Sequence, residues 1–240
     1  MAMLEQLNSA SHKVGLKINV SKTQLMTNLV LSEGVYIDGI QVEETTSCKY
    51  LGHEIRINRD NQTHELMKRI GLTWAAIGNL RHVFKADLPI CLKRKVFNQC
   101  VLPVLTYGAE TLTLTKVIVK KIKVAQRAME RSMLGLTLRN RITNIELRRR
   151  TKLIDAVERI AILKWNWAGH IARIQDNRWT KRIIEWRPRQ DAYRNRGRPS
   201  TRWSDDIRRI HTNWIQEAQN RKTWKQTREA YVLQWTNVTD

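Results

Sequence analysis

The 240-residue sequence has little cysteine, and none of it stands at metal-binding spacing. Its three cysteines, Cys48, Cys91 and Cys100, are odd in number and form no Cys-x-x-Cys unit. That usage argues against a disulfide framework and against a four-ligand zinc site. We therefore expect three reduced, half-buried thiols.

Long apolar runs are also lacking. Basic residues interrupt every apolar stretch well before the roughly 18 residues that a membrane-spanning helix needs. Residues 1–7 lack the basic stretch and apolar run of a secretory signal. The sequence thus predicts no membrane partner and an intracellular location, in the nucleus or the cytoplasm.

Acidic residues are scarce relative to basic ones. The chain has 43 lysines and arginines against 22 aspartates and glutamates, a formal net charge of +21. Such an excess needs a polyanionic partner or leaves strong self-repulsion. We expect the partner to be nucleic acid, either RNA or an RNA–DNA or DNA duplex. An apolar share of 42% is enough for one substantial core.

The first 60 residues carry one helix and several short β patterns. Residues 4–14 are predicted as the end of a helix that the following glycine stops. Apolar and polar residues alternate over 16–20, which predicts a strand, and 25–31 is predicted to continue extended. Asp38-Gly39 between two short apolar runs indicates a hairpin, because both turn positions need positive φ. Residues 48–57 are predicted as one more strand.

Beyond residue 60 the apolar period changes from two to three and four. One apolar helix face is predicted over 66–84, and a second helix between Pro89 and Pro103. A third follows over 117–133 and a fourth from the N-cap Asp155 to residue 174. Two shorter amphipathic helices are expected after residue 203.

A basic segment interrupts this helical pattern between residues 187 and 199. Two prolines and a glycine prevent regular structure there, and neighbouring aromatic side chains offer faces for base stacking. The alternative is a solvated linker. The arginines of this segment and its border are Arg187, Arg189, Arg194, Arg196, Arg198 and Arg202.

These patterns predict an α+β fold in three parts. Residues 1–60 form a small antiparallel sheet, residues 61–186 a mainly α-helical bundle, and residues 187–240 a basic linker with C-terminal helices.

Several segments, taken in order, resemble the reverse transcriptase of non-long-terminal-repeat (LINE-type) retrotransposons. Gly15-Leu16-Lys17-Ile18-Asn19 with Lys22-Thr23 resembles the palm segment after the catalytic hairpin, and Tyr50-Leu51-Gly52 is similar to the primer grip. The resemblance covers nearly the whole chain. The segments similar to the thumb and C-terminal tail are Tyr107-Gly108-Ala109-Glu110, Met133-Leu134-Gly135, Trp167-Ala168-Gly169-His170-Ile171-Ala172-Arg173, Gly197-Arg198-Pro199 and Arg202-Trp203-Ser204-Asp205-Asp206-Ile207.

The resemblance implies a palm edge over 1–60, a thumb-like bundle over 61–186 and a binding role. The family's RNA-directed DNA polymerases use aspartates that hold two Mg²⁺ ions. Those aspartates precede the segment that this chain resembles, as do the fingers and the endonuclease. We therefore expect a nucleic-acid-binding fragment that is inactive alone and holds no cofactor, with Mg²⁺ needed only by the full-length enzyme. The alternatives are a non-catalytic RNA- or DNA-binding module kept by the host, and a transposon relic.

No catalytic or metal-binding residue is expected, although the resemblance makes Lys22 a remnant palm lysine. The plainer interpretation of Lys22 is an exposed lysine at a strand end. Tyr50 and Gly52 would bring backbone close to a primer end, or else belong to a core strand with a bulge. The candidate nucleic-acid contacts are Lys17, Lys22, Tyr50, Gly52, Arg173, Arg187, Arg189, Arg194, Arg196, Arg198 and Arg202.

Two further groups have structural alternatives. Trp203-Ser204-Asp205-Asp206 matches an aromatic-x-Asp-Asp motif, but its arginine neighbours favour a helix start. Trp167, His170 and Arg173 share one helix side and could stack on nucleic acid, whereas an apolar stripe with tryptophan is more often core. A zinc site from His170 and His211 matches no compact ligand spacing.

Overall fold

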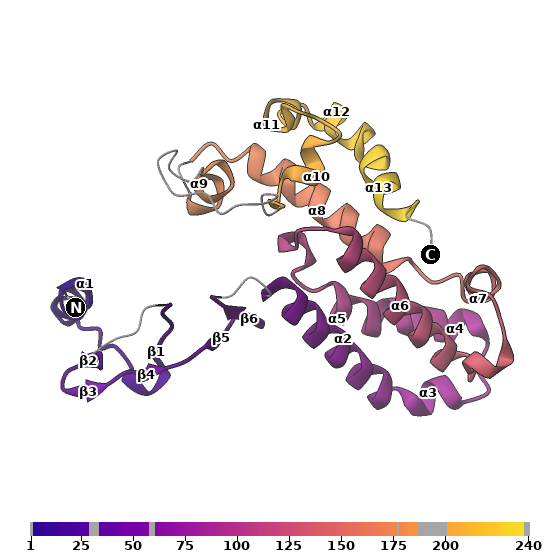
Figure 1. Cartoon of the computed structure of the whole chain (residues 1–240), viewed down its shortest axis with the longest axis horizontal. Coiled ribbons are helices and arrows are strands. Elements are labelled where there is room, and N and C mark those ends of the chain that lie inside the picture. Colours follow the sequence, from indigo (N-terminus) through magenta and orange to yellow (C-terminus); the bar gives the residue numbers. More distant parts are fainter. Residues whose placement is uncertain (1, 29–33, 58–60, 177, 187–200, 238–240) are drawn as a thin grey trace. The chain divides into compact units, whose positions relative to one another are not determined.

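A computed structural model describes residues 2–28, 34–57, 61–176, 178–186 and 201–237 (Figure 1). The chain divides into two compact units, Met1–Glu65 (unit 1) and Leu66–Asp240 (unit 2). Every described strand lies in unit 1, and the described part of unit 2 is helical. The predicted α+β class is therefore confirmed.

Unit 1 begins with helix α1 (Ala2–Lys13), followed by Gly15 at a φ of +74°. The predicted end of this helix is confirmed. Its strands form three separate two-stranded pairs. These are β1 (Gln24–Leu25) parallel with β4 (Glu43–Glu44), β2 (Tyr36–Ile37) antiparallel with β3 (Ile40–Gln41), and β5 (Ser47–Tyr50) antiparallel with β6 (His53–Arg56).

Two tight turns organise the antiparallel pairs. Asp38 and Gly39 have φ values of 50° and 75°, which confirms the predicted hairpin. Leu51 and Gly52 repeat this conformation, with φ values of 47° and 82°. The prediction of one strand over 48–57 is therefore wrong, because these two residues fold the segment into the β5–β6 hairpin.

Two other expectations for unit 1 fail. Residues 16–20 do not form a strand, and a 3₁₀ turn spans Val20–Lys22 instead. Side chains near Asn19 bond locally there, since Ser21 donates to the Asn19 side chain and Thr23 to its carbonyl oxygen, and such bonds compete with a strand. The β1–β4 pair is parallel rather than antiparallel. Of the predicted extended stretch 25–31, residues 29–31 lie outside the described residues.

The helices of unit 2 follow one another with short connections. They are α2 (Asn61–Asn79, which begins in unit 1), α3 (Arg81–Lys85), α4 (Ile90–Val96), α5 (Leu102–Thr106), α6 (Lys116–Met133), α7 (Asn144–Thr151), α8 (Ala156–Ala172), α9 (Trp179–Glu185), α10 (Asp205–Arg208), α11 (Trp214–Glu217), α12 (Arg221–Gln226) and α13 (Arg228–Thr236).

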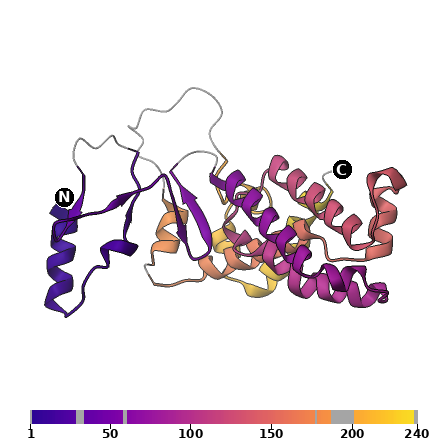
Figure 2. The ribbon, with the colours of Figure 1, turned by 90° about the horizontal axis from the view of Figure 1, so that it is seen from below.

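The core of unit 2 is built around α8. Contacts place α8 beside α13 and α6, as Figure 1 shows and Figure 2 presents from below. Ile160 and Trp165 of α8 and Ile122 and Met129 of α6 are fully buried. The Asp155 side chain accepts hydrogen bonds from the first turn of α8, which confirms the predicted N-cap.

Pro103 does not end a helix as predicted. A π-helical turn over Phe97–Val101 leads directly into α5, and Pro103 lies in the first turn of α5. A proline is tolerated there because its missing N–H would have no partner in a first turn.

Several smaller expectations for unit 2 also fail. The first predicted helix breaks at Leu80 into α2 and α3, and α7 was not expected. Cys91 and Cys100 are exposed, so only Cys48 is a half-buried thiol. The two expected C-terminal helices are four short ones. No helix in the described ranges is long and apolar enough to cross a membrane.

Candidate nucleic-acid interface

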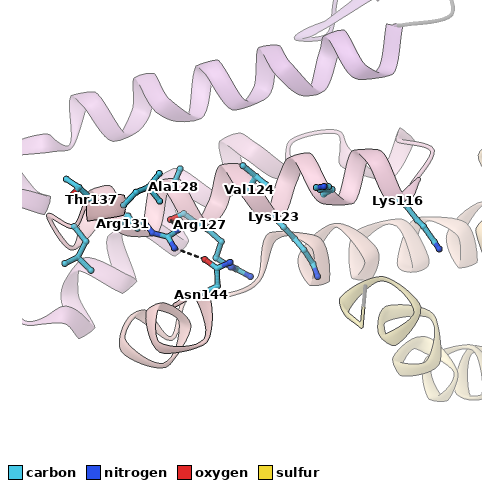
Figure 3. Close-up of a pocket in the computed structure, with 11 residues that line it drawn as sticks. Lys116, Lys123, Val124, Arg127, Ala128, Arg131, Thr137 and Asn144 are labelled. Atoms are coloured by element: carbon cyan, nitrogen blue, oxygen red, sulfur yellow. Dashed lines mark hydrogen bonds between the residues drawn. The ribbon is translucent and has the colours of Figure 1, made fainter. Parts of the chain in front are cut away.

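A row of basic residues follows one side of α6. Spacings of four, three, four and four residues put Lys116, Lys120, Lys123, Arg127 and Arg131 on a single helix face. All five line a groove of about 790 Å³ (Figure 3). The helix itself therefore arranges the cations in a line.

The rest of the groove lining is largely apolar. Val124 belongs to α6, and Leu136 and Leu138 come from the segment that follows it. Val124 and Leu138 are both strongly exposed, although neither is polar. A surface that combines cations with exposed apolar groups suits a chain of phosphates, sugars and bases.

The cations of this row differ in how their charge is balanced. Arg127 is buried and lies 2.8 Å from Glu130 and 3.1 Å from Asp155. Arg131 instead donates to the amide oxygen of Asn144 at 2.8 Å, the dashed contact in Figure 3. None of the ion pairs recorded for the described residues involves Lys116, Lys120 or Arg131. These three leave the groove positively charged.

The paired arginine fixes the groove to the helices beneath it. Arg148 of α7 also contacts Glu130, at 3.0 Å, and Asp155, at 3.6 Å. Burial raises the pKa of Asp155, but the Arg127 hydrogen bond and the Arg148 charge outweigh it and hold the pKa below its usual range. Glu130 and Asp155 therefore neutralise one end of the network and tie α6 to α7 and α8.

The sequence interpretation missed this basic row. It used the apolar residues of the same helix, of which Ile122 and Met129 are buried and Val117 is exposed. The available signal was the recurrence of lysine and arginine every three or four residues between 116 and 131.

The structure places the four unit 1 candidates on two segments. Lys17 and Lys22 are exposed, and Lys17 lines a hollow of about 570 Å³ together with residues of β3. Tyr50 is exposed at the end of β5, and Gly52 occupies the hairpin turn. Gly52 thus meets a requirement of the turn, and the segment is not the bulged core strand considered as the alternative.

The described unit 2 candidates make intramolecular contacts. Arg173 donates to the Ala218 carbonyl oxygen at 2.7 Å, and burial together with the Arg221 charge lowers its pKa. Trp167 and His170 stack with ring centres 5.5 Å apart. The exposed Arg202 donates its backbone N–H to Asp205. The other candidate arginines, Arg187, Arg189, Arg194, Arg196 and Arg198, lie outside the described residues.

The aromatic-x-Asp-Asp match begins a helix, as its arginine neighbours indicate. Asp205 and Asp206 form the first turn of α10. Asp206 is buried and accepts from Lys164 Nζ at 2.9 Å and from the Tyr231 hydroxyl at 2.7 Å. Its carboxylate is therefore engaged within the core. The described residues hold no group of three or more His, Cys, Asp or Glu side chains placed to bind a metal.

Comparison with known proteins gives a single line of relationship. No protein-family model matches the chain. No solved structure matches it either. The chain is 29% identical over 241 residues to a Caenorhabditis elegans protein described as an uncharacterized transposon-derived protein, covering 92% of this chain and 86% of that one. This similarity along nearly the whole chain supports a transposon origin.

Proposed function

We propose that this chain is a nucleic-acid-binding part of a transposon-encoded RNA-directed DNA polymerase of the non-long-terminal-repeat type. The observation that carries the binding role is the α6 groove, where Lys116, Lys120 and Arg131 lie beside exposed apolar side chains. The ordered motifs and the similarity to a transposon-derived protein support the origin.

The length of the basic row fits a nucleic-acid strand. Lys116 and Arg131 are 15 positions apart, which is about 22 Å along a helix axis. That length corresponds to about six nucleotides of one B-form strand. Phosphates bound along α6 would therefore meet a cation at each helical turn, while the apolar lining contacts sugars or bases.

A charge-reversal experiment tests this groove. The variant Lys116→Glu/Lys120→Glu places two acidic groups on the exposed end of the row. The matched control, Lys222→Glu/Lys225→Glu, makes the same charge change at exposed lysines of α12, away from the groove. Filter binding of a labelled 20-nucleotide RNA–DNA duplex should show at least a tenfold loss for the groove variant and a much smaller loss for the control.

Two results would overturn the proposal. Equal losses in both variants would mean that only the net charge attracts the duplex. Failure of the unmodified chain to bind at low salt would remove the binding role and favour a relic.

A further inference from the structure

Helix α9 presents a stripe of large apolar side chains to solvent. Trp179, Ile183 and the C-cap residue Trp186 fall within an arc of about 60° at 3.6 residues per turn. Their exposed fractions are 73%, 68% and 66%. Tryptophan is rarely left so exposed without a role in binding.

The outward direction of this stripe is fixed by the other side of the helix. Ile184 packs against the core of unit 2. Lys181 Nζ donates to the carbonyl oxygen of Ile174 at 3.1 Å, in the segment that follows α8. With those residues anchored, Trp179, Ile183 and Trp186 must face away from the core.

Cations accompany the two indole rings. The guanidinium carbon of Arg182 lies 5.3 Å from the ring centre of Trp179. Lys181 adds a second positive charge, and Glu185 is the one acidic residue within α9. An indole face next to a guanidinium group offers stacking to a base and charge to its phosphate.

We infer that the stripe of Trp179, Ile183 and Trp186 stacks with unpaired bases of a single-stranded RNA or DNA segment. This inference rests on the proposed nucleic-acid binding and adds a second contact that recognises bases. A protein interface fits less well, since a stable one buries about 800 Å² per partner, more than three side chains provide. Two copies of this basic chain would also repel each other.

Abasic strands provide the test because they keep every phosphate and remove every stacking face. Fluorescence polarisation would compare labelled dT12 with a 12-unit abasic strand on the full chain. We expect the unmodified chain to bind dT12 at least fivefold more tightly. Trp179→Ala/Trp186→Ala should remove that preference and leave abasic binding unchanged, and Trp179→Phe/Trp186→Phe should keep most of it. The control Ile145→Ala changes an exposed apolar residue of α7.

The outcomes separate this inference from the proposed function. If the unmodified chain binds both strands equally, the stacking site is wrong although the proposed function stands. If neither strand nor any duplex binds, the proposed function itself fails. Equal losses for both strands in the alanine variant, absent from Ile145→Ala, would also overturn stacking. A change in sedimenting mass on removing the tryptophans would assign the stripe to a second copy.

Discussion

Trp165 and Trp224 each donate an indole N–H to the main-chain carbonyl oxygen of the other. The two hydrogen bonds measure 2.8 and 3.0 Å, and the rings stack with centres 3.8 Å apart and planes 5° from parallel. The residues are 59 positions apart in sequence. The contact therefore binds α12 to α8 with both buried N–H groups satisfied.

Gly169 on α8 makes room for this pair. A Cβ there would lie 2.4 Å from Nε1 and 2.6 Å from Cδ1 of Trp224. We expect Gly169→Ala to displace the ring and to lower the free energy of unfolding by about 1–3 kcal/mol, measured by urea denaturation.

Gly78 provides the control, because it is also helical and a Cβ there meets nothing within 4 Å. Gly78→Ala should leave stability unchanged or raise it by about 0.5–1 kcal/mol, since alanine has the higher helix propensity. Similar effects at both positions would contradict the steric role of Gly169.

The buried Lys164–Asp206 pair should be needed for stability. Burial lowers the pKa of Lys164, while Asp206, at 2.9 Å, opposes the shift. Asp206→Asn would leave the ammonium group buried without its carboxylate, at an expected cost of about 3–5 kcal/mol in chemical denaturation.

The neighbouring Asp205 gives a matched substitution. Asp205 is partly exposed and lies 3.7 Å from Arg208, so Asp205→Asn should cost less than about 1 kcal/mol. A comparable loss in the two variants would show that Asp206 acts through something other than its buried charge.

Asp155 should make stability depend on pH in the acid range. Because its folded pKa is held below the ordinary value of 3.8, its stabilising contribution is present above that value and is lost as the pH falls through the folded pKa. Asp155→Asn keeps an N-cap residue but not the charge. The difference in unfolding free energy between the two proteins should shrink between pH 5 and pH 2, estimated from the usual range for aspartate (~3.9). A constant difference over that range would argue against this role.

The α6 groove should control the salt dependence of binding. Neutralising two phosphate contacts with Lys116→Gln/Lys120→Gln should reduce the slope of log affinity against log salt by about 1.8 for a duplex. Lys222→Gln/Lys225→Gln should leave the slope nearly unchanged. The opposite pattern would place the duplex on α12.

The chain alone should not extend a primer. Its aromatic-x-Asp-Asp match has Asp206 buried against Lys164 and Tyr231, where it cannot serve as a Mg²⁺ ligand without breaking that contact. We expect no incorporation from Mg²⁺, dNTPs and a primed RNA template, beside an active polymerase as positive control. Incorporation that co-purifies with the chain and is lost in Asp205→Asn would refute this expectation.

The sequence by itself determined the features that depend on near neighbours. The Asp38-Gly39 turn, the Asp155 cap and the apolar faces of α6 and α8 follow from turn chemistry, capping and period. The excess of positive charge also follows directly from composition and gives the expectation of a polyanionic partner.

Only the tertiary structure decided which of several identical residue types are buried. Trp165 and Trp224 are enclosed while Trp179 is exposed, because each of the first two finds its hydrogen-bond acceptor 59 positions away. Lys164 is buried because Asp206, 42 positions along the chain, balances its charge. Local sequence patterns contain no information on such distant partners, whereas burial of a polar group depends on them.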